Sequence, residues 1–346
     1  MYIKLMNIQN KNNYVFYWLL LMTFLVALMI FVGGLTRLTD SGLSITRWDL
    51  FSGIFPPLGT DAWINAFNLY KQIPEYRLIN YSMTLEQFKF IFWWEYAHRL
   101  LGRLIGIFYI IPLLYFIYNK KINSKFLKSY FLIFFLILLQ GYVGWYMVKS
   151  GLTERTDVSH YRLSIHLTLA FIIFILLFWN CLTYKNSKTF FSNKKNPFYL
   201  SLIFLILIMI QIFVGALVSG LDGGQIYQTW PLMNQSYFPD DSNIKDLFST
   251  KVFETPSILQ FIHRNIAYFI ILLFSFISII IYKNKDFTYL RNTTLLVLVF
   301  LLLQTFLGIF TVLSGAQIFL ASMHQIGSIF LITTTLILVF KNSNTN

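Results

Sequence analysis

Four of the five histidines stand at matching positions in a chain built mostly of apolar segments: His98, His166, His263 and His324. An ionisable side chain within a membrane span is costly and usually functional. Imidazole is a preferred ligand of haem iron, and two imidazoles on parallel neighbouring helices can bind one iron from opposite faces. We therefore expect two iron sites, one held by His98 and His166 and the other by His263 and His324. The alternative is four core histidines satisfied by hydrogen bonds.

The four histidines share one predicted depth in the membrane, measured from the first lysine that follows each of them. The intervals are 22 residues from His98 to Lys120, 19 from His166 to Lys185, 20 from His263 to Lys283 and 17 from His324 to Lys341. At about 1.5 Å per helical residue, all four lie roughly 25–33 Å from the cytoplasmic end of their segments. That depth is the outer rim of a hydrocarbon core about 30 Å thick.

A carboxyl group distinguishes the first histidine pair from the second. Glu95 lies three residues before His98 and therefore on the same helix face. The matching position before His263 is Gln260, which cannot ionise. Two interpretations stay open for Glu95. It forms an ion pair with Arg99 four residues later, or it acts beside the first iron site as a proton acceptor or as a charge that stabilises a cationic intermediate.

Three arginines flank the proposed ligands: Arg99, Arg103 and Arg264. A guanidinium fork suits a carboxylate, so we expect these side chains to bind the propionates of haem. The alternative is ordinary snorkelling to the membrane interface. The fifth histidine, His160, lies six residues before His166 on another helix face and has no counterpart later in the chain. We interpret it as an interfacial residue.

The elements that must position these residues are membrane helices. The chain has 346 residues, of which 57% are hydrophobic and only 12% are charged. This composition is typical of an integral membrane protein. We predict an all-α membrane protein with eight spans, at residues 15–35, 93–118, 127–148, 161–183, 198–219, 258–282, 293–314 and 320–340. The first is too long for a signal-peptide core, so we keep it as a span.

The net charge of +13 follows the predicted topology. Lysines and arginines gather in the second, fourth and sixth loops, around 120–128, 185–195 and 283–291, whereas the long first and fifth loops are balanced or acidic. This asymmetry places both termini and the even-numbered loops in the cytoplasm. Because the basic charge reports topology, we do not expect nucleic-acid binding. No transit-peptide pattern precedes the first span, which favours a bacterial inner membrane.

The chain contains an internal repeat of four spans. Matched segments are Phe31–Leu35 with Phe213–Leu217, Ala97–Arg99 with Ile262–Arg264, Leu138–Gly151 with Leu302–Gly315, and Ser164–Leu167 with Ser322–Gln325. Because four is an even number of spans, both halves have one orientation. We predict two parallel halves, 1–190 with one haem site and 191–346 with the other, related by a pseudo-two-fold axis along the membrane normal. Matched small residues, including Gly33, Gly34, Gly144, Gly215 and Gly308, would let the helices approach closely.

Several of these segments resemble the haem A synthase family of terminal-oxidase biogenesis. The resemblance is carried by Trp94–Arg103, Gly33–Ser44, Gln140–Leu152, Phe261–Arg264 and Ser322–Gln325, which together span nearly the whole chain. The first outer loop, with Trp48–Leu50 and Tyr70–Tyr76, resembles the form found in alphaproteobacteria and mitochondria. Cysteine pairs that some members carry in their outer loops are absent, because Cys181 is the only cysteine and lies within a span.

The resemblance implies an oxidoreductase. Members of the family oxidise a peripheral methyl group of haem O to the formyl group of haem A, by successive hydroxylation with water-derived oxygen and loss of water. It also implies that His263 and His324 hold a resident haem b, with iron as the bound metal. His98 and His166, with Glu95, would receive haem O as the substrate.

Two other classes of function stay open at this point. A membrane cytochrome with two bis-histidine haems would transfer electrons without changing either haem. A transporter would also fit a parallel repeat, but it would leave four histidines at one depth unexplained. The expected partners are membrane lipid and the haem O substrate, with the farnesyl-transferring haem O synthase as a candidate for hand-over. Neither the electron acceptor nor the oligomeric state follows from the sequence.

Overall fold

The computed structural model describes residues 13–47, 52–154, 156–186 and 196–343, and these residues are almost entirely helical. Within them, eight helices are long and apolar enough to cross a membrane. The eight are α1 (Asn13–Leu38), α4 (Leu85–Tyr118), α5 (Ser124–Glu154), α6 (His160–Asn186), α7 (Asn196–Gly220), α8 (Pro256–Lys283), α9 (Arg291–Leu313) and α10 (Ile318–Ser343). The predicted all-α membrane fold and its eight spans are therefore confirmed.

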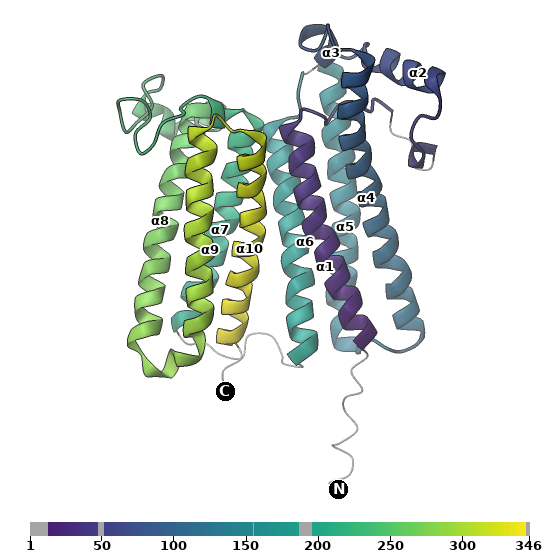
Figure 1. Cartoon of the computed structure of the whole chain (residues 1–346). Coiled ribbons are helices and arrows are strands. Elements are labelled where there is room, and N and C mark those ends of the chain that lie inside the picture. The colour runs from purple at the N-terminus through teal and green to yellow at the C-terminus, as the bar shows by residue number, and fades with distance from the viewer. Residues whose placement is uncertain (1–12, 48–51, 155, 187–195, 344–346) are drawn as a thin grey trace.

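The largest difference from the predicted spans is at the start of α4. This helix begins at Leu85, eight residues before the predicted span, and it rises above the rest of the bundle (Figure 1). A capping box starts it: Thr84 accepts from the Gln87 amide, and the Gln87 side chain accepts from the Thr84 amide. The first turn is too polar for a hydropathy argument to include it, because it carries Glu86 and Gln87.

The helices form two groups of four that lie side by side (Figure 1). In the first group α1 packs against α4 and α6, and α5 packs against α6. In the second group α7 packs against α8 and α10, and α9 packs against α10. The groups meet where α1 contacts α10 and where α6 contacts α7. These neighbour relations are the same in both halves, as the predicted pseudo-two-fold axis requires, and the axis itself stays a prediction. The predicted boundary at residues 190 and 191 lies outside the described residues.

The outer ends of α1 and α7 show the repeat in their backbone. Asp40 follows α1 with a φ of 47°, and its counterpart Asp222 follows α7 with a φ of 51°. Arg37 joins the two, donating to Asp40 Oδ1 at 2.8 Å and to Asp222 Oδ1 at 2.7 Å. The same guanidinium donates to the Ser219 carbonyl at 2.8 Å. One side chain thus connects the two halves at this end.

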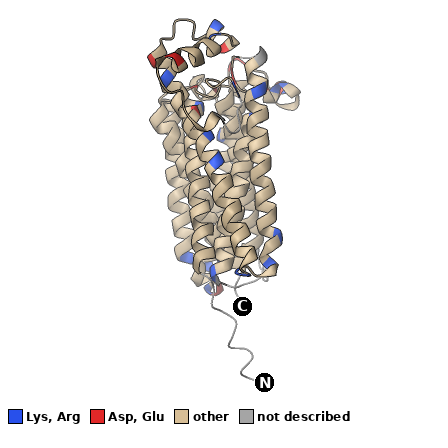
Figure 2. Cartoon of the chain, turned by 90° about the vertical axis from the view of Figure 1, so that its right-hand side faces the viewer, with Lys and Arg blue, Asp and Glu red and all other residues tan. Residues whose placement is uncertain are grey.

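The charged residues separate along the bundle axis. Asp and Glu lie mostly at the end that carries α2 (Thr60–Tyr70) and α3 (Pro74–Leu78), whereas the opposite end carries mainly Lys and Arg (Figure 2). The first residues of α1 and the last of α10 lie at that basic end (Figure 1). This distribution is the one on which the topology prediction rests, and we call the α2–α3 end the outer end.

The helices α2 and α3 form a small outer cap on α4. Phe67 and Tyr70 of α2 stack on Phe88 of α4, with ring centres 5.0 and 5.2 Å apart. Glu75 of α3 is buried beneath this cluster, only 5% exposed. Asn80 donates to the Tyr70 hydroxyl at 2.8 Å and to Glu75 Oε1 at 3.5 Å. The cap holds the segment between α1 and α4 against the outer part of α4.

Candidate functional site

The first histidine pair is brought together inside the first group of helices. The rings of His98 on α4 and His166 on α6 lie with their centres 6.5 Å apart and their planes inclined by 71°. Two imidazoles that bind one metal from opposite sides, with bonds of about 2.0 Å, place their ring centres about 6 Å apart. Nδ1 of His166 is buried without a hydrogen-bond partner. The spacing therefore suits two axial ligands of one iron. No group of three or more metal-ligating side chains occurs in the part of the chain that the structure describes.

The second pair, His263 on α8 and His324 on α10, is also close enough for the two rings to interact electrostatically. The Gln211 side chain of α7 donates to the His263 carbonyl at 2.9 Å, and its nitrogen lies 3.3 Å from His263 Nε2. Nδ1 of His324 lies 3.2 Å from the Gln304 carbonyl of α9. A hydrogen bond of this kind orients an imidazole and fixes which nitrogen is left for a metal.

Each of the four rings packs against a glycine on the preceding helix of its own half. A Cβ atom on that glycine would lie 3.1 Å from His98 Nε2 or 2.9 Å from Cε1 of each of the other three rings. The glycines are Gly33 for His98, Gly144 for His166, Gly215 for His263 and Gly308 for His324. The glycines were predicted to let helices approach closely. In the structure, the group that packs closely against each of them is the ring of a proposed ligand. We call these four contacts the glycine notches.

Gly34, next to the first notch, faces the other half of the molecule. The Gln325 side chain of α10 occupies the space in which a Gly34 Cβ would lie. Gln325 also donates to the Ile30 carbonyl of α1 at 2.8 Å. Because Gln325 follows His324 and Gly34 follows Gly33, this contact joins the surroundings of the two histidine pairs.

Glu95 is almost completely buried, and both of its oxygens accept hydrogen bonds. Oε2 accepts from the Ser44 hydroxyl and from the Ile45 amide, each at 2.7 Å. Oε1 accepts from Arg99 Nε at 3.0 Å and from Arg99 NH2 at 2.5 Å. The ion pair that the spacing allowed is therefore present. It also ties the loop after α1 to α4, one turn from His98. The proton-accepting and charge-stabilising roles stay predictions.

The matching positions of the second half bind the backbone of another loop. Gln260 donates to the Tyr227 carbonyl at 3.1 Å. Arg264 donates to the same carbonyl at 3.0 Å and to the Leu232 carbonyl at 3.3 Å. In both halves, the side chain three residues before the α4 or α8 histidine and the arginine after it hold the outer loop in place. Only the first half does so with a negative charge.

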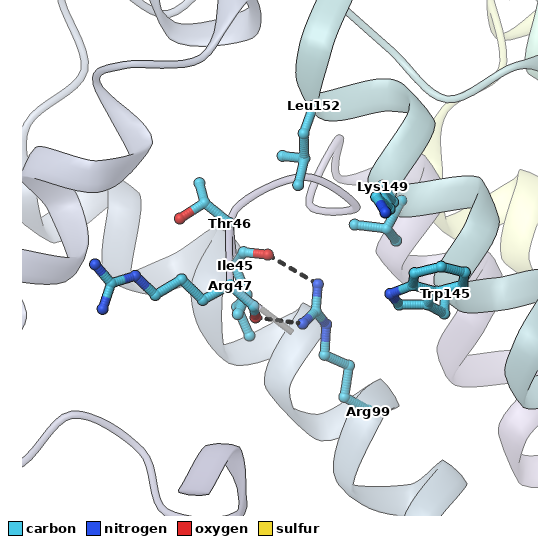
Figure 3. A pocket seen from close by; sticks show the side chains of 8 residues that line it. Ile45, Thr46, Arg47, Arg99, Trp145, Lys149 and Leu152 are labelled. Atoms are coloured by element: carbon cyan, nitrogen blue, oxygen red, sulfur yellow. Dashed lines mark hydrogen bonds between the residues drawn. The ribbon is translucent and has the colours of Figure 1, made fainter. Parts of the chain in front are cut away.

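Of the three arginines predicted to bind propionates, Arg99 and Arg264 face the outer loops, whereas Arg103 lies deeper in the bundle. Arg99 donates to the carbonyls of Ile45 at 2.8 Å and of Arg47 at 3.1 Å (Figure 3). Arg103 lies one turn further along α4, half-buried and within electrostatic range of Arg99. Arg264 is buried against its loop. Their role as propionate partners stays a prediction.

His160 is the first residue of α6, at the outer end, as its interfacial interpretation expects. It is nevertheless only 3% exposed, because it packs against Gly220 of α7. Its Nε2 lies 3.8 Å from Glu254 Oε2, and Tyr161 donates to Glu254 Oε1 at 2.6 Å. His160 therefore lies on the contact between the two halves.

Sequence reasoning did not identify the residues that support the site. Ser44 and the backbone of Ile45 and Arg47 come from a loop about 50 residues before their α4 partners. Gln140 donates to the His166 carbonyl at 3.0 Å, as Gln211 does to that of His263. Gln140 stood among the repeat matches, and its polarity in an apolar span was the signal that could have identified it.

Comparison with known proteins identifies the family of this chain. The family model described as "Cytochrome oxidase assembly protein" matches residues 16–336. Relatives named "Heme A synthase" are similar along nearly their whole length. One from Pelagibacter ubique is 49% identical over 97% of this chain and 99% of its own length. One from Rickettsia bellii is 44% identical over 92% and 95%, and one from Flavobacterium psychrophilum is 40% identical over 94% and 97%. The chain therefore belongs to the cytochrome oxidase assembly protein family, among whose members are proteins named haem A synthase.

Proposed function

We propose that this protein is a haem A synthase, an oxidoreductase that converts a peripheral methyl group of haem O into the formyl group of haem A. The observation that carries the proposal is the His98–His166 pair, whose ring spacing suits one iron, in a chain of this family. The neighbouring Glu95 has no ionisable counterpart in the second half. We assign the first pair to the substrate and the second to a resident haem b.

The reaction consists of two equivalent oxidations followed by a dehydration. In each oxidation the methyl-derived carbon loses two electrons and two protons overall while it gains an oxygen from water. After the second, the carbon carries two hydroxyl groups and loses one water to give the formyl group. Four electrons and four protons leave in total, and each oxidation places positive charge on the reacting carbon. The haem that His263 and His324 would hold would pass the electrons on to an external electron acceptor.

The contacts of Glu95 favour an electrostatic role in these oxidations. Its carboxylate accepts four hydrogen bonds, two of them from the Arg99 guanidinium. These contacts hold the carboxylate in place before the reaction begins. A preorganised charge of this kind stabilises a developing cation without reorganisation.

The second half fits a resident haem. Imidazole nitrogens of His263 and His324 would be its two ligands, and the Gln211 and Gln304 contacts orient the rings before anything binds. A haem with two histidine ligands has no open position and transfers electrons. Arg264, held over this site by the loop of residues 221–255, is the proposed partner of its propionates.

We also propose where the protein works. The separation of basic and acidic residues between the two ends of the bundle supports an orientation with both termini in the cytoplasm of a bacterial cell, and with the chain in the inner membrane (Figure 2). Haem O is apolar except for its propionates, so it reaches the site through the bilayer. Direct hand-over from haem O synthase is the partnership that we propose.

Extracted pigments test the function. Cells that make this protein together with a haem O source should accumulate haem A, and cells without that source should not. Glu95→Gln should keep the bis-histidine spectra but lower haem A formation at least tenfold, because it removes the charge and retains most of the shape. Unchanged haem A would refute the role of Glu95. The two-haem cytochrome is favoured instead if both sites keep haem b in the presence of haem O and no formyl haem appears.

A further inference from the structure

A cavity of about 230 Å³ lies at the outer end of the first half, between α4, α5 and the loop after α1. Its walls include Arg99, Trp145, Val148 and Lys149, together with the loop residues 45–47 (Figure 3). Two of the residues that line the cavity directly follow, in the sequence, residues of the first histidine site. Arg99 follows His98, and Trp145 follows Gly144, whose notch holds the His166 ring. The cavity therefore lies near the first pair, on its outer side, and is lined by the residues next to the site rather than by the histidines themselves.

The polar side-chain groups around this cavity are nearly all hydrogen-bond donors. Among the described residues no Asp or Glu lines it, and its cations are Arg47, Lys149 and Arg99, the last of which is paired with Glu95. Figure 3 shows the Arg47 side chain directed away from the cavity and the Trp145 indole nitrogen on the side that faces Arg99. Lys149 Nζ lies 4.9 Å from the Trp145 ring centre, and no described carboxylate forms an ion pair with it. A set of donors with a net positive charge suits an anionic oxygen ligand.

A second hollow, of about 390 Å³, adjoins the first on the exposed side of α5. The two share Trp145 and Lys149, and the second is otherwise lined by Tyr142, Tyr146 and Ser150. Tyr142 is 60% exposed and Tyr146 46% exposed, and both lie on a membrane-spanning helix. Aromatic side chains at this depth form the membrane interface. The combined surface thus joins an aromatic face open to lipid with a donor-lined end, which suits an amphiphile.

The second half lacks these donors. In the repeat register that matches Gly144 with Gly308, Trp145 corresponds to Ile309 and Lys149 to Leu313. Neither of these residues donates a side-chain hydrogen bond, and Arg264 is buried beneath its loop. The donor-lined cavity therefore belongs to the half whose haem must be exchanged in each turnover.

We propose that the two adjoining hollows form the entry and docking site of the haem substrate, with Lys149 and Trp145 binding its propionate carboxylates. This inference rests on the proposed function, since it assigns the first half to the substrate. The substrate enters sideways from the outer leaflet along Tyr142 and Tyr146. Its carboxylates then reach Lys149, which lies five residues, or about 7–8 Å, beyond Gly144 toward the outer end of α5. Lys149 is thus a positioning residue.

Esterified haem tests the docking site without relying on turnover. The full-length protein, with haem in its second site and in vesicles of zwitterionic lipid, is titrated with ferric protohaem and with its dimethyl ester. The Soret band reports binding to the first site. The free acid should bind about tenfold to a hundredfold more tightly than the ester, as expected for a charge-assisted hydrogen bond. Lys149→Met should abolish most of this preference, and Lys149→Arg should retain it.

Lys125→Met is the matched control, because Lys125 lies at the opposite end of the same helix. It should behave as the wild type does. An unchanged second-site spectrum shows that each variant is folded. The proposal is overturned if the wild type does not distinguish acid from ester, or if Lys149→Met keeps the preference. Haem A production is measured separately. A wild type that prefers the free acid but makes no haem A would refute the proposed function and leave the docking site standing.

Discussion

The glycine notches make a quantitative prediction about ligand position. In Gly144→Ala, the new Cβ would lie 2.9 Å from His166 Cε1 and 3.6 Å from both ring nitrogens. Carbon atoms in contact prefer about 3.5–4.0 Å, so the ring or the helix must move by roughly 0.6–1 Å. Since the His98 and His166 ring centres are 6.5 Å apart, a shift of that size displaces one ligand nitrogen from the iron position.

The expected cost follows from overpacking. Extra methyl groups in a packed interior destabilise by about 1–3 kcal/mol, which corresponds to a haem affinity lower by roughly fivefold to 150-fold if the strain appears in the bound state. The assay is spectral titration of the first site with haem in full-length protein. Gly144→Ala should bind haem more weakly there, while the second-site spectrum stays unchanged.

The same helix provides the control. A Cβ on Gly141, three residues earlier on α5, would have no described atom within 4 Å outside its own helix backbone, so Gly141→Ala should bind haem like the wild type. Gly308→Ala should produce the reverse selectivity, because its Cβ would lie 2.9 Å from His324 Cε1. The reasoning is refuted if Gly144→Ala and Gly141→Ala have equal haem affinities. It is also refuted if Gly144→Ala perturbs the second site more than the first.

Two further predictions concern the contact between the halves and the outer cap. Gly34→Ala should destabilise the protein by about 1–3 kcal/mol in thermal unfolding, because Gln325 must leave α1, whereas Ala216→Gly at the matched position of the second half should cost at most about 1 kcal/mol. Burial raises the pKa of Glu75 to about 8, so between about pH 4.5 and pH 8 the folded protein binds a proton that the unfolded chain has lost. The free energy of unfolding should therefore fall by about 1.4 kcal/mol per pH unit as pH rises through that window. Glu75→Gln should remove this part of the slope in thermal unfolding measured from pH 5 to pH 8, and an unchanged slope would show that Glu75 is not the group responsible.

The spans and the histidine pairs could be predicted from sequence because both depend on local pattern. A bilayer imposes a length of about 20 apolar residues on each helix, and the repeat supplied the pairing. The start of α4 could not be predicted in the same way, since a polar capping box sets it. The helices α2 and α3 are short. The stacking of Phe67 and Tyr70 on Phe88 holds α2 to α4, and α3 packs against α5.

The contacts that support the site could not be predicted, because they join distant parts of the chain. Glu95 is held by Ser44 and Ile45, about 50 residues away, and Gln325 reaches Ile30 across 295 residues. Spacing within one helix predicted the Glu95–Arg99 pair. It did not predict that the loop after α1 donates hydrogen bonds to the other carboxylate oxygen of Glu95. The glycines were recognised as matched small residues, and only the packing shows that each one faces a histidine ring.

In the function that we propose, the two halves use one framework for different purposes. In both, a histidine ring sits in a glycine notch and an arginine holds the outer loop by its carbonyls. A resident haem needs a closed site. At three positions where the second half differs from the first, it has the neutral Gln260 and the apolar Ile309 and Leu313. A substrate needs an entrance and a charge at the reacting carbon, and the first half has Glu95, Trp145 and Lys149 there instead. Giving the second half Leu313→Lys should therefore raise its preference for the free acid over esterified haem only slightly, because the loop over Arg264 still closes the approach.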